Sequence, residues 1–410
     1  MIGNKMDPNR RSVFRKIIKN MDPAAEPGHA VASGFYVPPP SAVGKRIATR
    51  LELDPTSSHL LIGGIGTGKT TELIQVESAL AEVGDTFSVR IDVPAVHRVD
   101  KLRPGVLIAL TANEAVERLK KKAKQAGMKI AQKEQGAIGE IRGLVHGHWE
   151  EWDDSHPHPG DRDVWVDGII EAPLRQHSVR VLSRAMAVVV QALGENFVVV
   201  FDGLDRLADP DLFSSVVVED VPAIRQAGVG VVLVGPQHVR LGNRRHIVDL
   251  FTEMHLHGAS SSQSPEGLLF LEQVVRRRAG GDVFGEGVVR ELAIFSAGLL
   301  RDLISIAQSA AEEAYVDGSE LIERSHMAVA TARFGQNLLL SATTEMVVRL
   351  KDIVAGSGAR HRSSRGFAVS SELDVAMLLA RLVVEIPGVP TRYLPHPAVV
   401  PFVTEMAGGS

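Results

Sequence analysis

Eight consecutive residues combine the side chains and glycine spacing that bind phosphate: Gly63-Gly64-Ile65-Gly66-Thr67-Gly68-Lys69-Thr70. Glycines let successive backbone N–H groups point into one concave space, which attracts an anion. In this pattern the lysine reaches the β- and γ-phosphates of a nucleoside triphosphate, and the last hydroxyl completes a Mg²⁺ shell. The sequence therefore predicts that residues Gly63 to Thr71 bind a nucleoside triphosphate, with Lys69 on its phosphates and Thr70 on Mg²⁺.

A second candidate site lies downstream, where an apolar run ends in a carboxylate. Residues 197–201 form a continuous apolar run, which is typical of a strand buried on both faces of a parallel sheet. Asp202 follows at the carboxyl end of that strand, where an aspartate beside a phosphate loop can hold Mg²⁺ through water. Asp202 is therefore predicted to be a metal ligand, and the next acid along the chain is Asp205.

The elements that would position these residues alternate between strand and helix. Several short apolar runs read as strands, and the stretch from Thr71 to Leu80 has helical spacing. Such alternation predicts a doubly wound α/β layer around a parallel sheet. The expected strands are residues 59–62, 87–93, 197–202, 229–235 and 253–257.

An insertion of about residues 105–165 interrupts this alternation. Residues 107–135 read as one long helix with a basic face, which is either solvated or a surface for phosphate or a partner. Residues 146–161 are rich in histidine and acids, but their prolines favour a loop over a metal site. A further helix is expected from Ala172 to Leu193.

The glycine loop and the segment Asp202-Gly203-Leu204-Asp205-Arg206 together resemble P-loop ATPases of the AAA+ and STAND classes and the related KAP group. In many AAA+ ATPases a glutamate directly follows the metal aspartate and polarises the attacking water, whereas this chain has Gly203. The resemblance implies slow hydrolysis with Asp205 orienting the water; the alternative is that Asp205 pairs with Arg206. It implies ATP rather than GTP, because the only guanine-type tetrapeptide, residues 4–7, precedes the loop.

The same resemblance implies two nucleotide contacts within the core. Tyr36 and Val37 stand just before the first strand, where they would cover the adenine, although packing alone would also explain them. Gln237 or His238 follows the fourth strand, in the place of a first sensor or of a plain turn.

Arginines could act on the phosphates from two other places. Arg301 resembles the second-sensor arginine, whose charge-assisted contact with the γ-phosphate would make lid closure depend on the nucleotide. Surface pairing of Arg301 with an acid is the alternative. Arg244 and Arg245 precede the fifth strand, where AAA+ neighbours insert an arginine into the adjacent site; solvation of a helix end is the alternative.

The rest of the chain divides by composition and spacing. A polar arm is expected over residues 1–34, the ATPase core over 35–258, and a helical lid over 259–335. Residues 336–410 resemble a winged helix, with a helix over 371–382 followed by a strand–turn–strand wing. A winged helix can bind DNA or act as an internal clamp, and the charge of this segment is nearly balanced.

Composition excludes several classes of protein. The 410 residues contain no cysteine, which excludes disulfides, zinc ribbons and thiol catalysis. A net charge of −4 argues against wholesale coating of nucleic acid. The sequence shows neither a signal core nor a membrane-length apolar run, so a cytoplasmic protein without a membrane partner is expected.

The leading functional hypothesis is an ATP-dependent switch that uses ATP and Mg²⁺. Lid closure on ATP would present a surface for homo-oligomer assembly or for a protein partner, as in bacterial defence or mobile-element ATPases. Two alternatives belong to other classes: a DNA-binding regulator that uses the winged helix, and a nucleotide-binding scaffold without meaningful turnover. Retention on DNA would distinguish the first alternative from the switch, and phosphate release would distinguish the second.

Overall fold

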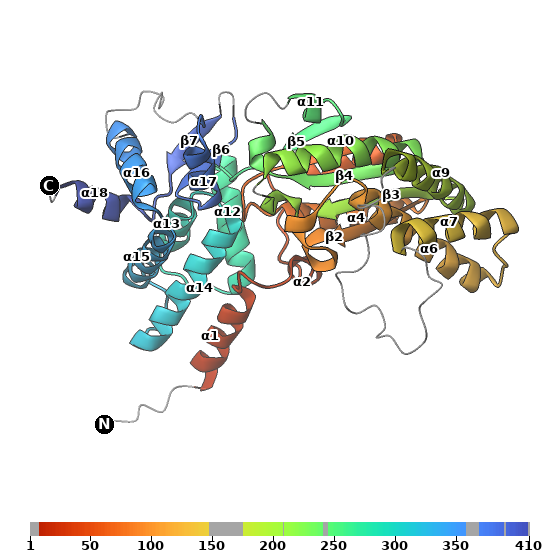
Figure 1. Ribbon diagram of the computed structural model, residues 1–410. Coiled ribbons are helices and arrows are strands. Elements are labelled where there is room, and N and C mark those ends of the chain that lie inside the picture. The colour runs from red at the N-terminus through yellow and green to blue at the C-terminus, as the bar shows by residue number, and fades with distance from the viewer. Residues whose placement is uncertain are drawn as a thin grey trace, which may run out of the picture. The chain divides into compact units, whose positions relative to one another are not determined.

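The computed structural model describes residues 8–146, 175–207, 209–240, 245–357, 369–388 and 391–408. The chain forms two compact units. The sheet unit comprises Val43–Ile62 and Glu72–His255, and the loop-and-lid unit comprises Met1–Ala42, Gly63–Thr71 and Leu256–Ser410. Figure 1 labels their elements.

The sheet unit is built on a five-stranded sheet in the order β2-β3-β4-β1-β5. The pairs β2–β3, β3–β4 and β1–β4 are parallel, so the carboxyl ends of these strands share one edge. This confirms the expected α/β P-loop fold with a parallel sheet. The strands are β1 (Ser58–Ile62), β2 (Thr86–Asp92), β3 (Asn196–Asp202), β4 (Val229–Gly235) and β5 (Glu253–Leu256).

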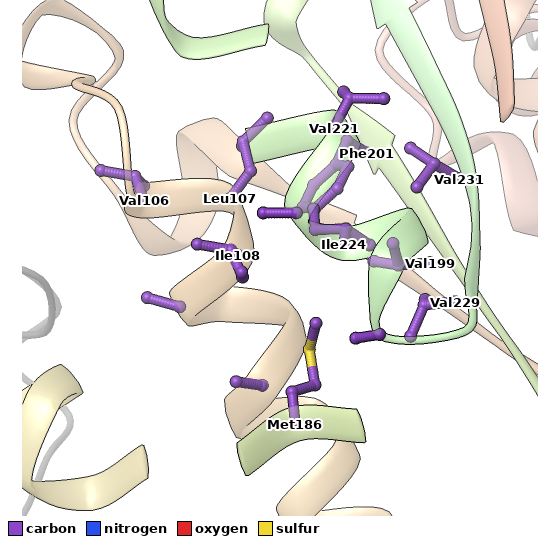
Figure 2. Packing of buried hydrophobic residues seen from close by; sticks show 14 of the residues in the cluster. Val106, Leu107, Ile108, Met186, Val199, Phe201, Val221, Ile224, Val229 and Val231 are labelled. Carbon is purple, nitrogen blue, oxygen red and sulfur yellow. The ribbon is translucent and has the colours of Figure 1, made fainter. Parts of the chain in front are cut away.

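Helices cover both faces of this sheet because strand residues alternate between two apolar layers. On one face Phe197, Val199 and Phe201 of β3 pack with helices α6, α9 and α10; Figure 2 shows part of this cluster. On the other face Val198 and Val200 pack with α3 and α4. The helices are α3 (Val43–Leu53), α4 (Lys69–Val83), α5 (Val93–Val96), α6 (Val106–Ala126), α7 (Gln132–His146), α9 (Arg175–Leu193), α10 (Pro210–Gln226) and α11 (Arg245–Val248). Short 3-10 turns are η1 (Val99–Lys101), η3 (Leu204–Arg206) and η4 (Gln237–Arg240).

The predicted single helix over 107–135 is wrong, because the structure has two helices there. Helix α6 ends where Gly127 adopts φ +64°, a left-handed conformation that glycine tolerates and that terminates helices. Helix α7 starts only at Gln132. The histidine-rich segment 146–161 lies outside the described residues from position 147 onward.

The basic face of α6 is partly neutralised inside the sheet unit. Arg118 forms a two-pronged ion pair with Glu195, and its guanidinium also lies over the ring of Phe87. Lys122 lies 3.5 Å from the same glutamate, and Lys120 pairs with Glu117. These contacts favour a structural and solvated role for the face.

The described part of the expected polar arm over residues 1–34 contains two helices. Helix α1 (Pro8–Asn20) buries Phe14 and Ile17, and Met21 follows it into the same apolar cluster. Arg10 anchors α1 by donating to the carbonyls of Ala314 and Tyr315 at 2.9 Å. Because lysine and arginine lie between the apolar residues, the segment is polar in overall composition even though one face of the helix is apolar. A short helix α2 (Pro27–Ala32) follows.

The segment predicted to form a lid is helical and contains α12 (Pro265–Ala279), α13 (Val288–Phe295), α14 (Leu300–Asp317) and α15 (Arg324–Leu340). The boundary expected at 335/336 falls inside α15, which serves two cores. Met327 packs in the lid cluster, whereas Leu338 packs with the C-terminal elements. Those elements are α16 (Thr344–Ser357), α17 (Glu372–Leu379), the antiparallel hairpin of β6 (Val383–Ile386) and β7 (Arg392–Pro395), and α18 (Val400–Gly408).

Candidate functional site

The glycine loop has the backbone geometry that its sequence predicts. Gly66 and Gly68 adopt φ values of +85° and +101°, which side chains other than glycine rarely adopt. The loop leads directly from β1 into α4, whose first residue is Lys69. The strand–loop–helix order therefore places successive N–H groups and a helix N-terminus around one concave loop, which is the arrangement that binds phosphate.

Lys69 lies folded over this loop rather than extended into solvent. Its ammonium donates to the carbonyl of Gly63 at 3.0 Å and to that of Gly64 at 2.9 Å, and the residue is only 6% exposed. A buried ammonium needs such acceptors to compensate for lost hydration. Phosphate oxygens are stronger acceptors than carbonyls, so the same ammonium can exchange these partners for a bound polyphosphate.

His257, just beyond β5, supports the loop from within the same unit. Its Nε2 lies 3.0 Å from the carbonyl oxygen of Thr67, to which it donates, and Ser41 Oγ lies 3.5 Å from its Nδ1. Burial, followed by the charge of Lys69, lowers the pKa of His257 to about 4. His257 is thus a neutral imidazole that fixes the loop backbone, a role that the sequence did not indicate.

The start of α14 contacts the same loop through its backbone. The N–H of Arg301 donates to the carbonyl of Gly66 at 3.1 Å. A Cβ at Gly66 would lie 3.0 Å from Arg301 Cβ, and one at Gly68 would lie 2.9 Å from Leu300 Cδ1. The Arg301 side chain is exposed and makes no ion pair within the described part of the chain. The alternative of a surface ion pair therefore has no support there.

Gly63 is the loop position with the least space for a side chain. A Cβ there would lie 2.9 Å from the carbonyl carbon of His257 and still closer to its oxygen. We expect Gly63→Ala to displace the loop, to lower the free energy of unfolding by about 1–3 kcal/mol through overpacking, and to weaken nucleotide binding. Chemical denaturation of the variant checks this.

Gly136→Ala is the matched control for that substitution. Gly136 is an exposed glycine of α7 with no atom within 4 Å of its would-be Cβ. Alanine is favoured over glycine in a helix by about 1 kcal/mol, so the control should be neutral or stabilising. Equal stability of the two variants would contradict the close packing of the loop.

Asp202 ends β3 in the sheet unit, where it is 8% exposed. Its Oδ1 accepts the N–H of Gly203 at 2.8 Å, and its Oδ2 lies 3.9 Å from a guanidinium nitrogen of Arg90. Arg90 also donates to Glu77 on α4 at 3.1 Å. Burial raises the pKa of Glu77, Arg90 opposes that rise, and Asp202 adds to it. The charge of Asp202 is thus partly balanced by Arg90, a residue that the sequence analysis missed.

The backbone at Gly203 explains why no glutamate follows Asp202 in this chain. It adopts φ +85°, and a Cβ would lie 2.7 Å from Pro94 Cγ and 3.2 Å from Asp92 Oδ1. Both the backbone conformation and the neighbouring β2–α5 connection exclude a side chain. The departure from the AAA+ pattern at this position is therefore built into the fold.

Two further acids lie near the end of β3. Asp205, predicted from sequence, is half-buried on the one-turn helix η3. Asp92 is exposed at the end of β2, and its Cα pairs with that of Asp202 in the parallel register. In the sequence Asp92 is recognisable only as an acid at the end of an alternating strand. The pairing of β2 with β3 is what brings it beside Asp202.

The adenine candidates lie in the same unit as the loop. Val37 is 6% exposed and belongs to the apolar cluster of α1 and the lid, so packing accounts for it. Tyr36 is half-buried, and its carbonyl accepts a hydrogen bond from Arg277 on α12. Neither observation tests contact with a base.

The remaining candidates are described only in part. Gln237 and His238 lie in η4 directly after β4, as a first sensor would, and Gln237 is half-buried. Arg245 begins α11, but its side chain is not described, and Arg244 lies outside the described residues.

A separate histidine cluster sits at the opposite end of β1. His59 Nδ1 lies 3.0 Å from His255 Nε2, and His59 Nε2 lies 3.0 Å from Ser57 Oγ. Because Ser57 donates to the carbonyl of Asp54 at 2.6 Å, it accepts from His59, which in turn accepts from His255. Burial, followed by His255, lowers the pKa of His59 to about 3. With Glu253 these residues form a metal-type cluster, but the hydrogen-bond relay accounts for both histidines without an ion.

The residues present fit Mg²⁺ bound with a triphosphate. Thr70 and Asp202 would supply hydroxyl and carboxylate oxygens, the ligand atoms that this hard cation prefers. Lys69 already lies against the loop, where its ammonium donates to the carbonyl of Gly63. No helix within the described part of the chain has the length and apolar character to cross a membrane.

Comparisons with known proteins give structural neighbours but no match in sequence. No protein-family model matches the chain, and no curated protein matches it in sequence. Similar solved structures include Drosophila ORC bound to DNA, at 14% identity and a TM-score of 0.43 over 98% of this chain and 95% of that chain. The Aeropyrum pernix ORC1 protein in complex with DNA has 15% identity and a TM-score of 0.43, over 90% and 93%. Cdc6p from Pyrobaculum aerophilum has 12% identity and a TM-score of 0.41, over 95% and 98%. At these values the likeness concerns the fold, which the strand order and the glycine loop establish.

Proposed function

We propose that this chain is an ATP-binding, slowly hydrolysing switch of the AAA+/STAND type, whose lid responds to the nucleotide. The observation that carries the proposal is the attachment of α14 to the glycine loop, through the Arg301 N–H and the carbonyl of Gly66. A ligand that binds the loop would therefore contact the same residues that hold the start of α14. Nucleotide binding and lid position are therefore linked in free energy.

Mg²⁺–ATP would be bound by three side chains with different roles: Lys69, Thr70 and Asp202. Lys69 would exchange its two carbonyl acceptors for β- and γ-phosphate oxygens, and Thr70 and Asp202 would hold the metal. Their cooperation is supported by topology: the loop follows β1 directly, and β1 and β3 both flank β4 in parallel. Bound Mg²⁺ supplies neutralisation of the charge that develops on the phosphates.

The lid would read the γ-phosphate through Arg301. Its backbone is fixed at the loop while its side chain is exposed, so the guanidinium can reorient without breaking an ion pair of the described residues. A guanidinium forms two parallel hydrogen bonds with phosphate, which a diphosphate without the γ-group would not offer at the same place. ATP and ADP would therefore favour different lid positions.

Assembly into a homo-oligomer is the second part of the proposal. Arg244 or Arg245 would contact the nucleotide of a neighbouring copy, stabilising charge on the transferred phosphoryl group. Sedimentation with a non-hydrolysable ATP analogue tests this part. A monomer at all concentrations would remove the assembly role and leave the single-chain switch.

DNA binding through the C-terminal elements has less support. The basic face of α6 is engaged by Glu195 and Glu117, and the arginines of residues 360–365 lie outside the described residues. The C-terminal hairpin instead packs on the connector: a Cβ at Gly258 would lie 2.7 Å from Pro387 Cδ. This contact favours the reading of a winged helix as an internal clamp.

Measurement of phosphate release from Mg²⁺–ATP tests the proposed activity. We expect slow, Mg²⁺-dependent release that is lost on addition of a chelator, because Thr70 and Asp202 act through the metal. ATP binding without any release would favour the nucleotide-binding scaffold. Salt-sensitive retention on DNA that is independent of ATP would favour the DNA-binding regulator.

A further inference from the structure

The edge of the sheet that carries Asp202 holds a second carboxylate on the same face. Ile91 packs in the apolar layer of α6, α9 and α10, and so does Phe201. Because side chains alternate along a strand, Asp92 and Asp202 both lie on the other face, which α3 and α4 cover. Their Cα atoms are partners in the β2–β3 register, on neighbouring strands about 4.8 Å apart.

Asp92 has no structural task that the described part of the chain reveals. It occupies the N-cap position of α5, but its side chain makes no capping hydrogen bond. It is exposed, and it forms no ion pair with any described residue. An acid at the carboxyl end of a parallel strand, beside a metal-ligand candidate and without a local partner, is available for a substrate or a water molecule.

Asp92 lies next to Gly203, the position at which many AAA+ ATPases have the glutamate that polarises water. In the AAA+ pattern that glutamate would start from the Cβ at position 203. Here the Oδ1 atom of Asp92 lies 3.2 Å from where that Cβ would be. The carboxylate of Asp92 on β2 therefore lies next to the position where the side chain of the AAA+ glutamate would begin.

We propose that Asp92 orients and deprotonates the attacking water in the ATP hydrolysis proposed above, on which this inference rests. Asp205 is the competing residue. It lies beyond Gly203 on η3 rather than on a strand, and it already has an interaction partner in the structure. Asp92 is adjacent to Asp202 through the rigid ladder of the sheet, which fixes a reacting group better than a single turn does.

The reaction that Asp92 would assist is a displacement at phosphorus. The water oxygen forms a bond to the γ-phosphorus while the bond from that phosphorus to the β,γ-bridging oxygen breaks. The electron pair of the broken bond leaves with ADP. Asp92 accepts one proton of the water and returns it to solvent after phosphate leaves. A carboxylate in this role contributes about 10²- to 10⁴-fold to a rate.

The test compares Asp92→Asn with wild type in single-turnover hydrolysis, with binding measured on the same samples by the melting shift with Mg²⁺–ATP. We expect the rate to fall by about 100-fold or more, with the melting shift unchanged. The unfolding midpoint without ATP should also be unchanged, because the side chain of Asp92 makes no capping hydrogen bond and no ion pair with the described residues. Asp92→Glu keeps the carboxylate and should recover part of the rate.

Two aspartates serve as controls. Asp100→Asn changes an exposed acid that pairs only at the surface, with Arg98, and should leave the rate unchanged. Asp205→Asn changes the competing residue, and a greater loss of rate in Asp92→Asn than in Asp205→Asn would assign the water to Asp92.

Each other result has a defined meaning. Wild-type turnover by Asp92→Asn, or a loss confined to Asp205→Asn, would overturn the role of Asp92 and leave the ATPase proposal intact. If the wild-type protein bound ATP but did not hydrolyse it, the role of Asp92 would be overturned and the nucleotide-binding proposal would remain. Absence of any ATP-dependent shift in wild type would instead defeat the proposed function itself.

Discussion

Lys69→Ala is expected to abolish the stabilisation of this protein by Mg²⁺–ATP. The substitution removes the ammonium that now donates to the carbonyls of Gly63 and Gly64 and that would meet the β- and γ-phosphates. A ligand at a hundredfold its Kd stabilises the native state by about 2.7 kcal/mol through mass action. We expect wild type to gain this stabilisation and Lys69→Ala to gain none. Thermal unfolding at matched ligand concentrations measures the difference.

Lys101→Ala is the matched control for this experiment. Lys101 is an exposed lysine of η1, and its removal changes the net charge equally. The control should keep the full ATP-dependent shift. If Lys69→Ala also kept it, the lysine would belong to the loop structure alone and the phosphate-binding role would be wrong.

Asp202→Asn should produce the largest loss of hydrolysis. Asparagine keeps an oxygen that can accept the Gly203 N–H, but it removes the charge that would attract Mg²⁺. Metal stabilisation of the transition state is worth several kcal/mol, so a loss of about 10³-fold in rate is expected, since each 1.4 kcal/mol is tenfold. Steady-state phosphate release over a Mg²⁺ titration measures it.

The Mg²⁺ dependence distinguishes a metal role from a folding defect. A metal ligand should raise the Mg²⁺ concentration needed for half-maximal rate, and the unfolding midpoint in chelator should move little. Asp54→Asn removes a partly exposed acid that pairs with Arg50 and should change neither quantity. An unchanged rate and Mg²⁺ dependence in Asp202→Asn would place the metal elsewhere.

Local signals in the sequence predict the central elements well. Continuous apolar runs become β3 and β4 because both faces of these strands are buried, and the glycine pattern gives the loop with its left-handed residues. The backbone of Arg301 contacts the loop, and the contact of its side chain with the γ-phosphate stays a prediction. Each of these features depends on neighbours in sequence or on a motif that keeps its geometry.

Features that depend on distant contacts could not be predicted in the same way. The role of His257 arises from its hydrogen bond to Thr67, and that of Asp92 from the pairing of β2 with β3. Helix α1 was missed because Phe14 and Ile17 are interspersed with basic residues, and only the lid cluster reveals their common face. Sequence patterning cannot supply the partner that buries such a face.

Calorimetric titration of the wild-type protein with ATP in the presence of Mg²⁺ measures whether the glycine loop binds the nucleotide. We expect one saturable site per chain, weakened by a chelator and absent from Lys69→Ala. Absence of saturable binding to wild type, or equal affinity of wild type and Lys69→Ala, would contradict it.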